Sequence, residues 1–430
     1  MAVLKKMTPG RFIVLGFASV ITLGAILLLL PISANEGVKV SIIDAFFTST
    51  SAVCVTGLIA IDTADTFNIF GRTVVALLIQ IGGLGVTSVG VGFIILAGKK
   101  VGFKERVLVK EAMSLNSMKG IVKLVKSILL LTLCFEVIGA ILSFLVFSRD
   151  YSPLSALGIS VFHSIAAFNN SGFDILGGLR NLIPYRDNVL LNLVTCGLII
   201  FGGLGFFVIK EIIHVHSFKK FSLHTKVVIT MTATLLVVGT ILLKATENIT
   251  WLAAFFHSTS ARTAGFSTYP LGGFTNAGLF VLIILMFIGA SPGSTGGGIK
   301  TTTFFTLIKS AYSVATNKHC MAYKRKIPND VVFKAFIVTF LALMVVCLNT
   351  LFLCVLEPEY TFIQLLFEVT SAFGTVGLST GITPDLSVLS KVIVIITMFI
   401  GRLGPLTMVT IWYFKAQSNV SYSEENITIG

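Results

Sequence analysis

Charged residues are scarce in this sequence of 430 residues: only 12% are Asp, Glu, Lys or Arg, and 55% are hydrophobic. A soluble domain carries about 25% charged residues, so this chain could not cover several soluble domains with a water-facing surface. The six cysteines include no Cys-x-x-Cys pair, which argues against a disulfide framework or a metal site. The composition excludes a secreted disulfide scaffold and a disordered chain, and it predicts a polytopic membrane protein.

Long apolar runs are abundant, and most are close to the ~20 residues that a helix needs to cross a bilayer. They cover residues 12–31, 73–97, 127–147, 188–209, 227–243, 277–290, 335–356 and 392–414. The first run follows three basic residues, as in a signal peptide, but it is longer than the ~7–15 apolar residues of such a signal. We therefore expect the first run to be a retained helix.

The net charge of +13 is unevenly distributed between the connections. The N-terminus, the segments around 99–126, 210–226 and 309–334 and the tail hold 22 Lys and Arg against 6 Asp and Glu, whereas the other connections hold 7 against 11. Basic connections stay in the cytoplasm, so we expect a multi-pass protein of the cell membrane with both termini cytoplasmic. Membrane topology thus explains the positive net charge, and nucleic acid is not an expected partner.

A two-part pattern recurs four times along the chain. A half-length apolar segment ends in a glycine followed by Leu or Phe, at residues 51–58, 166–173, 260–266 and 371–378. The long helix that follows carries a second signature, Ile-Gly-Gly-Leu-Gly at 81–85 and variants of it at 201–205, 288–292 and 400–404. Glycine alone often marks close helix packing, but two motifs at nearly fixed spacing indicate an internal repeat.

The sequence therefore predicts an all-α polytopic membrane protein made of four fused repeats around a pseudo-fourfold pore. Each repeat would be a helix, a short pore helix, a filter segment and a second helix, giving eight spanning helices and four pore helices. We expect repeat 1 at 1–98, repeat 2 with its preceding cytoplasmic loop at 99–213, repeat 3 at 214–318, repeat 4 at 319–415 and a flexible cytoplasmic tail at 416–430.

The segments before the four glycines are expected to form an ion filter. Irregular backbone is not tolerated against lipid, the C-terminal ends of short helices favour a cation, and glycine lets carbonyls turn inward. Rings of carbonyl oxygens can replace the hydration shell of potassium. The expected filter residues are Val55, Thr56, Gly57, Asn170, Ser171, Gly172, Thr263, Ala264, Gly265, Thr375, Val376 and Gly377. Arg262 would point away while its carbonyl faces the pore.

These four segments resemble the degenerate filters of the Trk/Ktr/HKT superfamily of potassium transporters, over residues 10–415. The first spanning helix begins near residue 12, so the chain looks like a Ktr-type membrane subunit without the extra N-terminal helices of Trk-type subunits. The resemblance implies potassium uptake, selectivity for potassium because all four glycines are present, and no enzymatic activity or cofactor. It also implies a homodimer and a soluble RCK-type nucleotide-binding regulatory subunit, similar to KtrA or KtrC. Sodium dependence stays open.

The third repeat departs from the others after Pro292. Three consecutive glycines, each costing about 1 kcal/mol relative to alanine in a helix, predict an irregular intramembrane loop. By resemblance this loop is a gate, with the candidate residues Gly293, Ser294, Thr295, Gly296, Gly297, Gly298, Lys300 and Arg402. Arg402 replaces a signature glycine, and a membrane-buried arginine is a functional candidate. We predict that it contacts loop carbonyls; the alternative is that it neutralises Glu368 or a helix dipole.

Four other interpretations of the chain are less well supported. A sodium- or proton-coupled carrier with a midplane site would use Glu136 and Glu368 as proton relays, but it favours inverted repeats. A structural scaffold would not need the filter glycines. The loop at 293–301 resembles a phosphate loop, but no strand precedes it. The pairs His163-Ser164 and His257-Ser258 cannot form a catalytic dyad, because neighbours on a helix do not face each other; we expect them to anchor the pore helices by hydrogen bonds.

Overall fold

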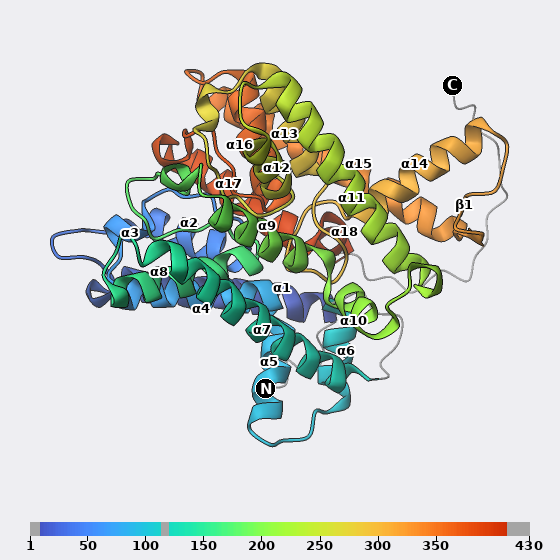
Figure 1. The fold of residues 1–430 in the computed structure, drawn as a ribbon, viewed down its shortest axis with the longest axis horizontal. Helices are drawn as coiled ribbons and strands as arrows, with labels where there is room; N and C mark the ends of the chain where they lie inside the picture. Colours follow the sequence, from blue (N-terminus) through green and yellow to red (C-terminus); the bar gives the residue numbers. More distant parts are fainter. Residues whose placement is uncertain (1–8, 113–119, 411–430) are drawn as a thin grey trace.

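The computed structural model describes residues 9–112 and 120–410. This part of the chain is mainly helical, with one short antiparallel hairpin, β1 (Met321–Ala322) and β2 (Arg325–Lys326) (Figure 1). The predicted all-α polytopic fold is confirmed. The tail predicted at 416–430 lies outside the described residues.

Each repeat begins with a long apolar helix that is long enough to cross a membrane. These helices are α1 (Pro9–Leu29), α7 (Ile121–Phe147), α11 (Leu223–Thr246) and α15 (Asn329–Leu356). Large apolar side chains on them, such as Leu23, Leu133 and Phe340, are exposed in the isolated chain. Uncovered apolar surface of this extent is expected where a helix faces lipid.

A shorter helix follows in each repeat and packs against the long helix of the same repeat. The short helices are α2 (Ile42–Val53), α8 (Pro153–Phe168), α12 (Trp251–Ser260) and α16 (Phe362–Gly374). Their starts are fixed by local chemistry: Ser41 and Thr250 cap α2 and α12, and Thr361 forms a capping box with Gln364 at α16.

Serine hydroxyls hold three of these short helices to their long neighbours. Ser49, Ser164 and Ser258 donate to carbonyls of Ile21, Glu136 and Leu236, at 2.7, 2.6 and 3.0 Å. A glycine of the long helix faces each serine, and a Cβ at any of them would overlap the hydroxyl: Gly24, Gly139 and Gly239. The close approach of the two helices therefore requires glycine at these positions.

The second helix of each repeat is broken at its signature glycines. The segments are α4 (Ile69–Leu84) with α5 (Val86–Leu96), α9 (Val189–Leu204) with α10 (Phe206–Val215), α13 (Asn276–Phe287) with α14 (Thr301–Ala315), and α17 (Val388–Leu403) with α18 (Pro405–Thr410). The first two pairs bend by 97° and 98°, so the apolar runs at 73–97 and 188–209 do not form straight helices. The reason is local: Gly85, Gly205 and Gly404 have φ of +82°, +93° and +87°, which no helix interior contains.

By length and apolarity, the described residues hold four spanning helices, or six when each bent pair is counted as one span. The second helix of the third repeat breaks earlier than the others: α13 has 12 residues, whereas α4, α9 and α17 have 16 residues each.

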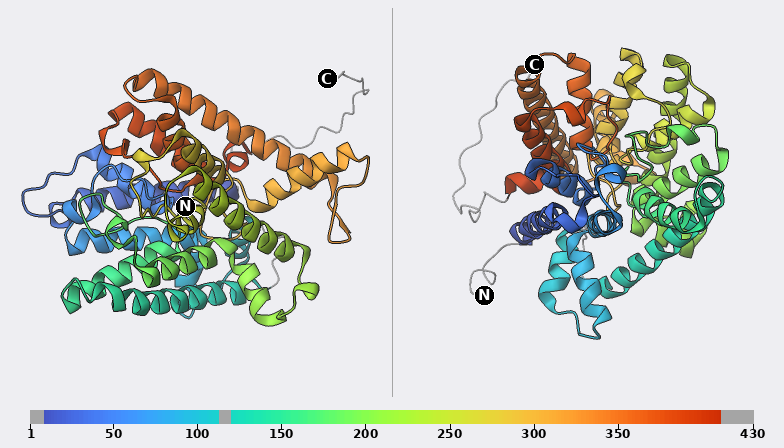
Figure 2. Two further views of the ribbon diagram at one scale, coloured as in Figure 1. Left: turned by 45° about the horizontal axis from the view of Figure 1, so that its top comes forward. Right: turned by 90° about the vertical axis from the view of Figure 1, so that its left-hand side faces the viewer.

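The repeats close into a ring in chain order. The second helix of each repeat packs on the short helix of the next one: α4 on α8, α9 on α12, α13 on α16, and α17 back on α2. Figure 2 (right) shows the blue, green, yellow and red parts of the chain following one another around a common centre. A four-membered ring places the C-terminal ends of the short helices near one axis.

The remaining elements lie at the two ends of this ring. They are η2 (Pro31–Ser33), α3 (Thr63–Thr66), α6 (Phe103–Ala112), η3 (Ile183–Tyr185), η4 (Phe218–Lys220), η5 (Leu271–Gly273) and η6 (Thr383–Asp385). The hairpin and the end of α14 extend away from the ring (Figure 1).

Candidate ion pathway

The four predicted filter segments, called filters from here on, share one backbone conformation. In each, the residue two positions before the glycine has a positive φ: 56° at Val55, 58° at Asn170, 77° at Thr263 and 49° at Thr375. The glycines themselves also have positive φ: Gly57, Gly172, Gly265 and Gly377. A left-handed conformation costs a non-glycine residue roughly 1–2 kcal/mol, and it is a genuine outlier for β-branched residues. Strain at the same position in four repeats points to a functional constraint.

Serines that the sequence patterns did not reveal brace three of the filters from behind. The Ser51 hydroxyl accepts from the N–H of Gly57 at 3.0 Å and donates to the carbonyl of Leu58 at 2.8 Å. Ser371 accepts from Gly377 N–H at 3.1 Å, and Ser260 donates to the carbonyl of Phe266 at 2.5 Å. Each of these serines directly precedes the alanine of the repeat motif, so the Ser-Ala pair was the available signal.

The filter glycines face one another around the axis. A Cβ at Gly57 would overlap the carbonyl oxygen of Ser171, and a Cβ at Gly172 would lie 2.7 Å from that of Ala264. The ring continues in the same sense, because Gly265 faces the carbonyl of Val376 and Gly377 faces that of Thr56. The structure thus brings the predicted filter residues of all four repeats together. The eight that are not glycine are fully buried: Val55, Thr56, Asn170, Ser171, Thr263, Ala264, Thr375 and Val376.

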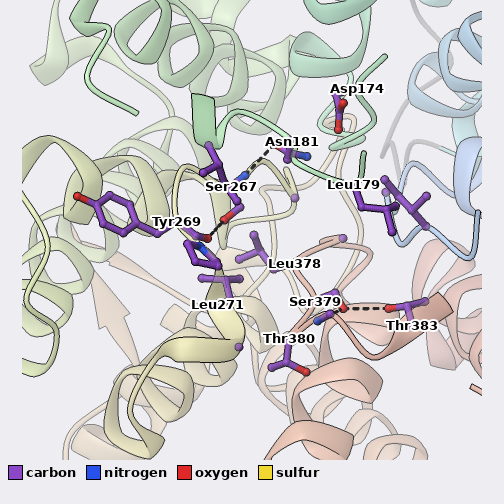
Figure 3. A pocket seen from close by; sticks show the side chains of 18 of the residues that line it. Asp174, Leu179, Asn181, Ser267, Tyr269, Leu271, Leu378, Ser379, Thr380 and Thr383 are labelled. Atoms are coloured by element: carbon purple, nitrogen blue, oxygen red, sulfur yellow. Dashed lines mark hydrogen bonds between the residues drawn. The ribbon is translucent and has the colours of Figure 1, made fainter. Parts of the chain in front are cut away.

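On one side the filter opens into a cavity of about 370 Å³, called the vestibule from here on (Figure 3). Three filter glycines line it: Gly57, Gly265 and Gly377. The residues two positions after the four glycines line it too: Ile59, Asp174, Ser267 and Ser379. The sequence did not point to these four residues, because the residue type at this position differs between repeats and forms no repeated motif.

Asn181 links the second and third filters at the edge of the vestibule. Its Nδ2 donates to the carbonyl of Gly172 at 3.2 Å. Its Oδ1 accepts from the N–H of Ser267 at 3.0 Å, a bond that Figure 3 shows. The sequence contains no repeated counterpart of Asn181, so its role could not be predicted.

Glu368 is fully buried behind the fourth filter. Its carboxylate accepts from the hydroxyls of Ser379 and Thr383, at 2.6 and 2.8 Å, and from the N–H of Thr380 at 2.9 Å. The alternative in which Arg402 neutralises Glu368 is therefore wrong. Through these hydrogen bonds the carboxylate fixes the segment that leaves the fourth filter.

Replacing Glu368 with alanine should lower the midpoint of thermal unfolding in detergent by about 5 °C. The substitution removes the acceptor of the Thr380 N–H and of the Ser379 and Thr383 hydroxyls, which retain one hydrogen bond to each other at 3.0 Å. Each buried group left unpaired costs about 1–3 kcal/mol. Glu368→Gln, which keeps one acceptor oxygen, should fall between alanine and wild type. Glu359→Ala, at an exposed site, is the control and should unfold as wild type. An unchanged midpoint for Glu368→Ala would contradict this role.

On the other side of the filter lies the irregular segment between α13 and α14, called the loop from here on (residues 288–300). The N–H groups of Ser291 and Thr295 donate to carbonyls of Gly203 and Gly202, at 3.0 and 3.2 Å. The N–H of Gly297 donates to the hydroxyl of the filter residue Thr375 at 3.0 Å. A segment of the third repeat thus contacts the second and fourth repeats directly under the filter.

Arg402 joins the loop to the first repeat. Its guanidinium donates to the carbonyls of Thr295 in the loop and of Gly82 in α4, with Gly83 at 3.5 Å. The predicted contact with a loop carbonyl is present. Lys300 closes the loop on itself, because its Nζ donates to the carbonyls of Gly296 and Gly297 at 2.8 and 3.3 Å. Arg402 ties the loop to the first and fourth repeats, and the loop's own N–H groups tie it to the second.

The other polar residues singled out from the sequence have structural partners, with one exception. Glu136 accepts from Asn169 at 3.0 Å, and His163 Nε2 lies 2.9 Å from the hydroxyl of Thr195. The Arg262 side chain points toward Thr232 in α11, at 3.5 Å, as predicted. The hydrogen bond expected of His257 is wrong: neither ring nitrogen has a partner within 9–112 and 120–410, and the ring packs edge-on against Phe256, Tyr269 and Phe274.

A helical multi-pass protein whose four short helices end at one buried axis, between a vestibule and a loop, belongs to the class of membrane transport proteins. The family model described as TrkH, cation transport protein, matches residues 12–422. The chain therefore belongs to the TrkH family.

Individual relatives support this assignment. The chain is 38% identical to the Ktr system potassium uptake protein B of Bacillus subtilis, over 99% of this chain and 97% of that protein. It is 39% identical to the potassium/sodium uptake protein NtpJ of Enterococcus hirae, over 99% and 98%. The crystal structure of the potassium transporter TrkH from Vibrio parahaemolyticus has the same fold, with a TM-score of 0.73 at 20% identity over 95% of this chain and 86% of that one.

Proposed function

We propose that this chain takes up potassium across the cell membrane as the translocating subunit of a Ktr-type system. The ion would pass through a filter lined by the backbone carbonyls of residues 55–57, 170–172, 263–265 and 375–377. By the distribution of basic residues, the vestibule faces outward and both termini lie in the cytoplasm. Relatives along the full length of the chain are named as potassium uptake proteins.

The observation that carries this proposal is the repeated pair of positive φ angles in the four filters. Such a backbone is neither helix nor strand. Its carbonyls therefore do not accept the regular hydrogen bonds of secondary structure and can face the axis. Four filters supply rings of neutral oxygens in which a dehydrated potassium ion replaces its water ligands. The buried hydroxyls and serine braces behind the filter resist its collapse.

The loop and Arg402 form the gate in this proposal. The loop lies across the side of the filter opposite the vestibule and is held there by contacts with three repeats. Moving it requires only the exchange of hydrogen bonds made by glycine-rich backbone, which has little side-chain packing to lose. A rearrangement of 293–298 would therefore open the path toward the cytoplasm.

The regulated form is proposed to be a homodimer that docks a soluble RCK-type nucleotide-binding subunit. The word "system" in the names of the Bacillus subtilis and Vibrio alginolyticus relatives describes a multi-component transporter. Sodium stands beside potassium in the name of the Enterococcus hirae relative, so the proposal includes a test of whether potassium uptake depends on sodium.

Growth of an uptake-deficient bacterial host at low potassium tests this function. Expression of the chain should restore growth at potassium concentrations that do not support the host alone, and co-expression of an RCK-type subunit should enhance the rescue. Sodium added at constant potassium reports the sodium dependence. Failure of rescue in both arms, with the protein present in the membrane, would refute potassium uptake.

A further inference from the structure

We propose that the vestibule holds a binding site for a monovalent cation, separate from the filter, whose charge is supplied by the carboxylate of Asp174. This inference rests on the proposed function, since it gives the transported ion a first stopping point on its way to the filter.

The position of Asp174 distinguishes it from its counterparts in the other repeats. Residues two positions after the filter glycines line the vestibule in all four repeats, and the other three are Ile59, Ser267 and Ser379. Of the described residues that line the vestibule, Asp174 is the single charged one. Figure 3 shows it at the upper edge of the group, with its carboxylate turned toward the other lining residues.

The carboxylate is buried but incompletely paired. Asp174 is 8% exposed, and its Oδ1 accepts from the N–H of Leu176 at 3.0 Å. Its Oδ2 receives no hydrogen bond from residues 9–112 and 120–410. Removing this carboxylate from bulk water disfavours its charged form, and a cation in the vestibule would offset that cost.

The nearby arginine does not fill this role. Arg180 is exposed, and its guanidinium donates instead to the carbonyls of Gly177 and Leu176, at 3.1 and 3.3 Å. The ion pairs found in the described part of the chain, Arg186 with Asp187 and Lys391 with Asp44, do not involve Asp174. The charge of Asp174 is thus left for an ion.

The surroundings favour a monovalent cation. Asp62 and Asp65 add negative potential while they accept from the N–H groups of Leu179 and Gly178, at 2.7 and 2.9 Å. The hydroxyl hydrogen of Ser267 is donated to the carbonyl of Tyr269, which leaves its oxygen as an acceptor. One carboxylate with neutral oxygens suits a singly charged ion, whereas calcium sites use several carboxylates. No cluster of three His, Cys, Asp or Glu able to hold a metal occurs among the described residues.

Protons should compete for this site near neutral pH. Burial is the main reason that the pKa of Asp174 rises to about 7; Asp62 and Asp65 raise it further, and the Leu176 N–H and Arg180 lower it. His163 shares a small adjoining cavity with Asp174 and is paired with Thr195. A carboxyl with this pKa is charged above pH 7 and neutral below it. The external site is therefore strong at pH 8 and weak at pH 6.

The test measures the rate of potassium uptake into proteoliposomes as a function of the external potassium concentration. It is done at external pH 8 and pH 6 with the membrane potential fixed. For wild type, KM should rise about fivefold from pH 8 to pH 6, as expected for loss of one nearby charge. Asp174→Asn keeps the size and the bond to Leu176, and it should show the higher KM at both pH values. The maximal rate and the potassium-to-sodium ratio should stay unchanged, because the filter is intact. Asp174→Glu should restore part of the pH dependence.

Asp187→Asn is the matched control. It removes the same charge from the same connection, at a residue that does not line the vestibule, and it should behave as wild type. A wild-type KM that is equal at pH 8 and 6 would overturn the proposal without any variant, and so would an unchanged KM in Asp174→Asn. If wild type carried no potassium at all, the proposed function itself would fail, so the two failures are distinguishable.

Discussion

Replacing Gly57 with serine is expected to lower the ratio of potassium to sodium flux by about tenfold, or roughly 1.4 kcal/mol of discrimination. Two features of the site produce this effect. Gly57 has a φ of +88°, where a side chain is strained by about 1–2 kcal/mol. Its new Cβ would also overlap the carbonyl oxygen of Ser171. Both would displace the first and second filters, and the fit of a carbonyl ring to potassium over sodium depends on their positions.

Flux ratios in proteoliposomes measure this change, with Gly158→Ser as the control. Gly158 lies in the short helix α8 with an ordinary helical φ, and a Cβ added to it would meet no atom within 4 Å. The same substitution there should therefore keep the wild-type ratio. The filter assignment would be refuted if Gly57→Ser, correctly inserted, discriminated between the two ions as well as wild type.

Replacing Arg402 with glutamine is expected to raise potassium flux in the absence of a regulatory subunit by roughly tenfold or more. The guanidinium donates to carbonyls of Thr295 and Gly82, and hydrogen bonds to a charged group contribute about 1.5–3 kcal/mol each. Losing about 3 kcal/mol from the closed state shifts the closed–open equilibrium toward the open state by more than about a hundredfold. Holding the guanidinium away from bulk water already costs free energy in the closed state, and glutamine lowers that cost, so we expect a smaller net rise in flux, of roughly tenfold or more. Shortening 293–298 should raise flux in the same direction, because it removes the obstruction itself.

Arg72→Gln is the matched control for Arg402. Arg72 also donates to two backbone carbonyls, of Phe67 and Ala64 at 2.7 and 2.6 Å, but it lies at the start of α4, away from the loop. Potassium flux through the Arg72→Gln variant should depend on the regulatory subunit as it does in wild type. The gate assignment fails if the shortened protein, inserted and folded, conducts no more than wild type.

The fold could be predicted from the sequence because the repeated glycines lie where two helices approach each other closely. A Cβ at the signature residues Gly82, Gly202 and Gly401 would overlap the carbonyls at 53, 168 and 373, at the ends of the short helices. These contacts leave no space for a side chain, so the same position of the signature is glycine in each of these repeats. In the third repeat the equivalent Gly289 meets Gly297 of the loop instead, and there the sequence departs from the pattern as well.

The missed features are those that occur once or that depend on tertiary contact. Asn181 and Asp174 have no counterparts of the same type in the other repeats, so no periodicity pointed to them. The bends at Gly85 and Gly205 were missed because apolar residues continue through them, and hydropathy does not record a change of φ. His257 was expected to form a hydrogen bond because of its type, but the aromatic rings around it fill its site.

The central claim is that potassium moves passively through a selective pore, and one measurement tests it most directly. The purified chain is reconstituted into liposomes with a potassium gradient and with equal sodium and equal pH on both sides, and the loop is shortened at 293–298 to hold the gate open. We expect downhill potassium flux that needs neither a proton nor a sodium gradient and that Gly57→Ser makes less selective. Potassium flux that appears only when a proton or sodium gradient is imposed would contradict a passive pore and would favour a coupled carrier.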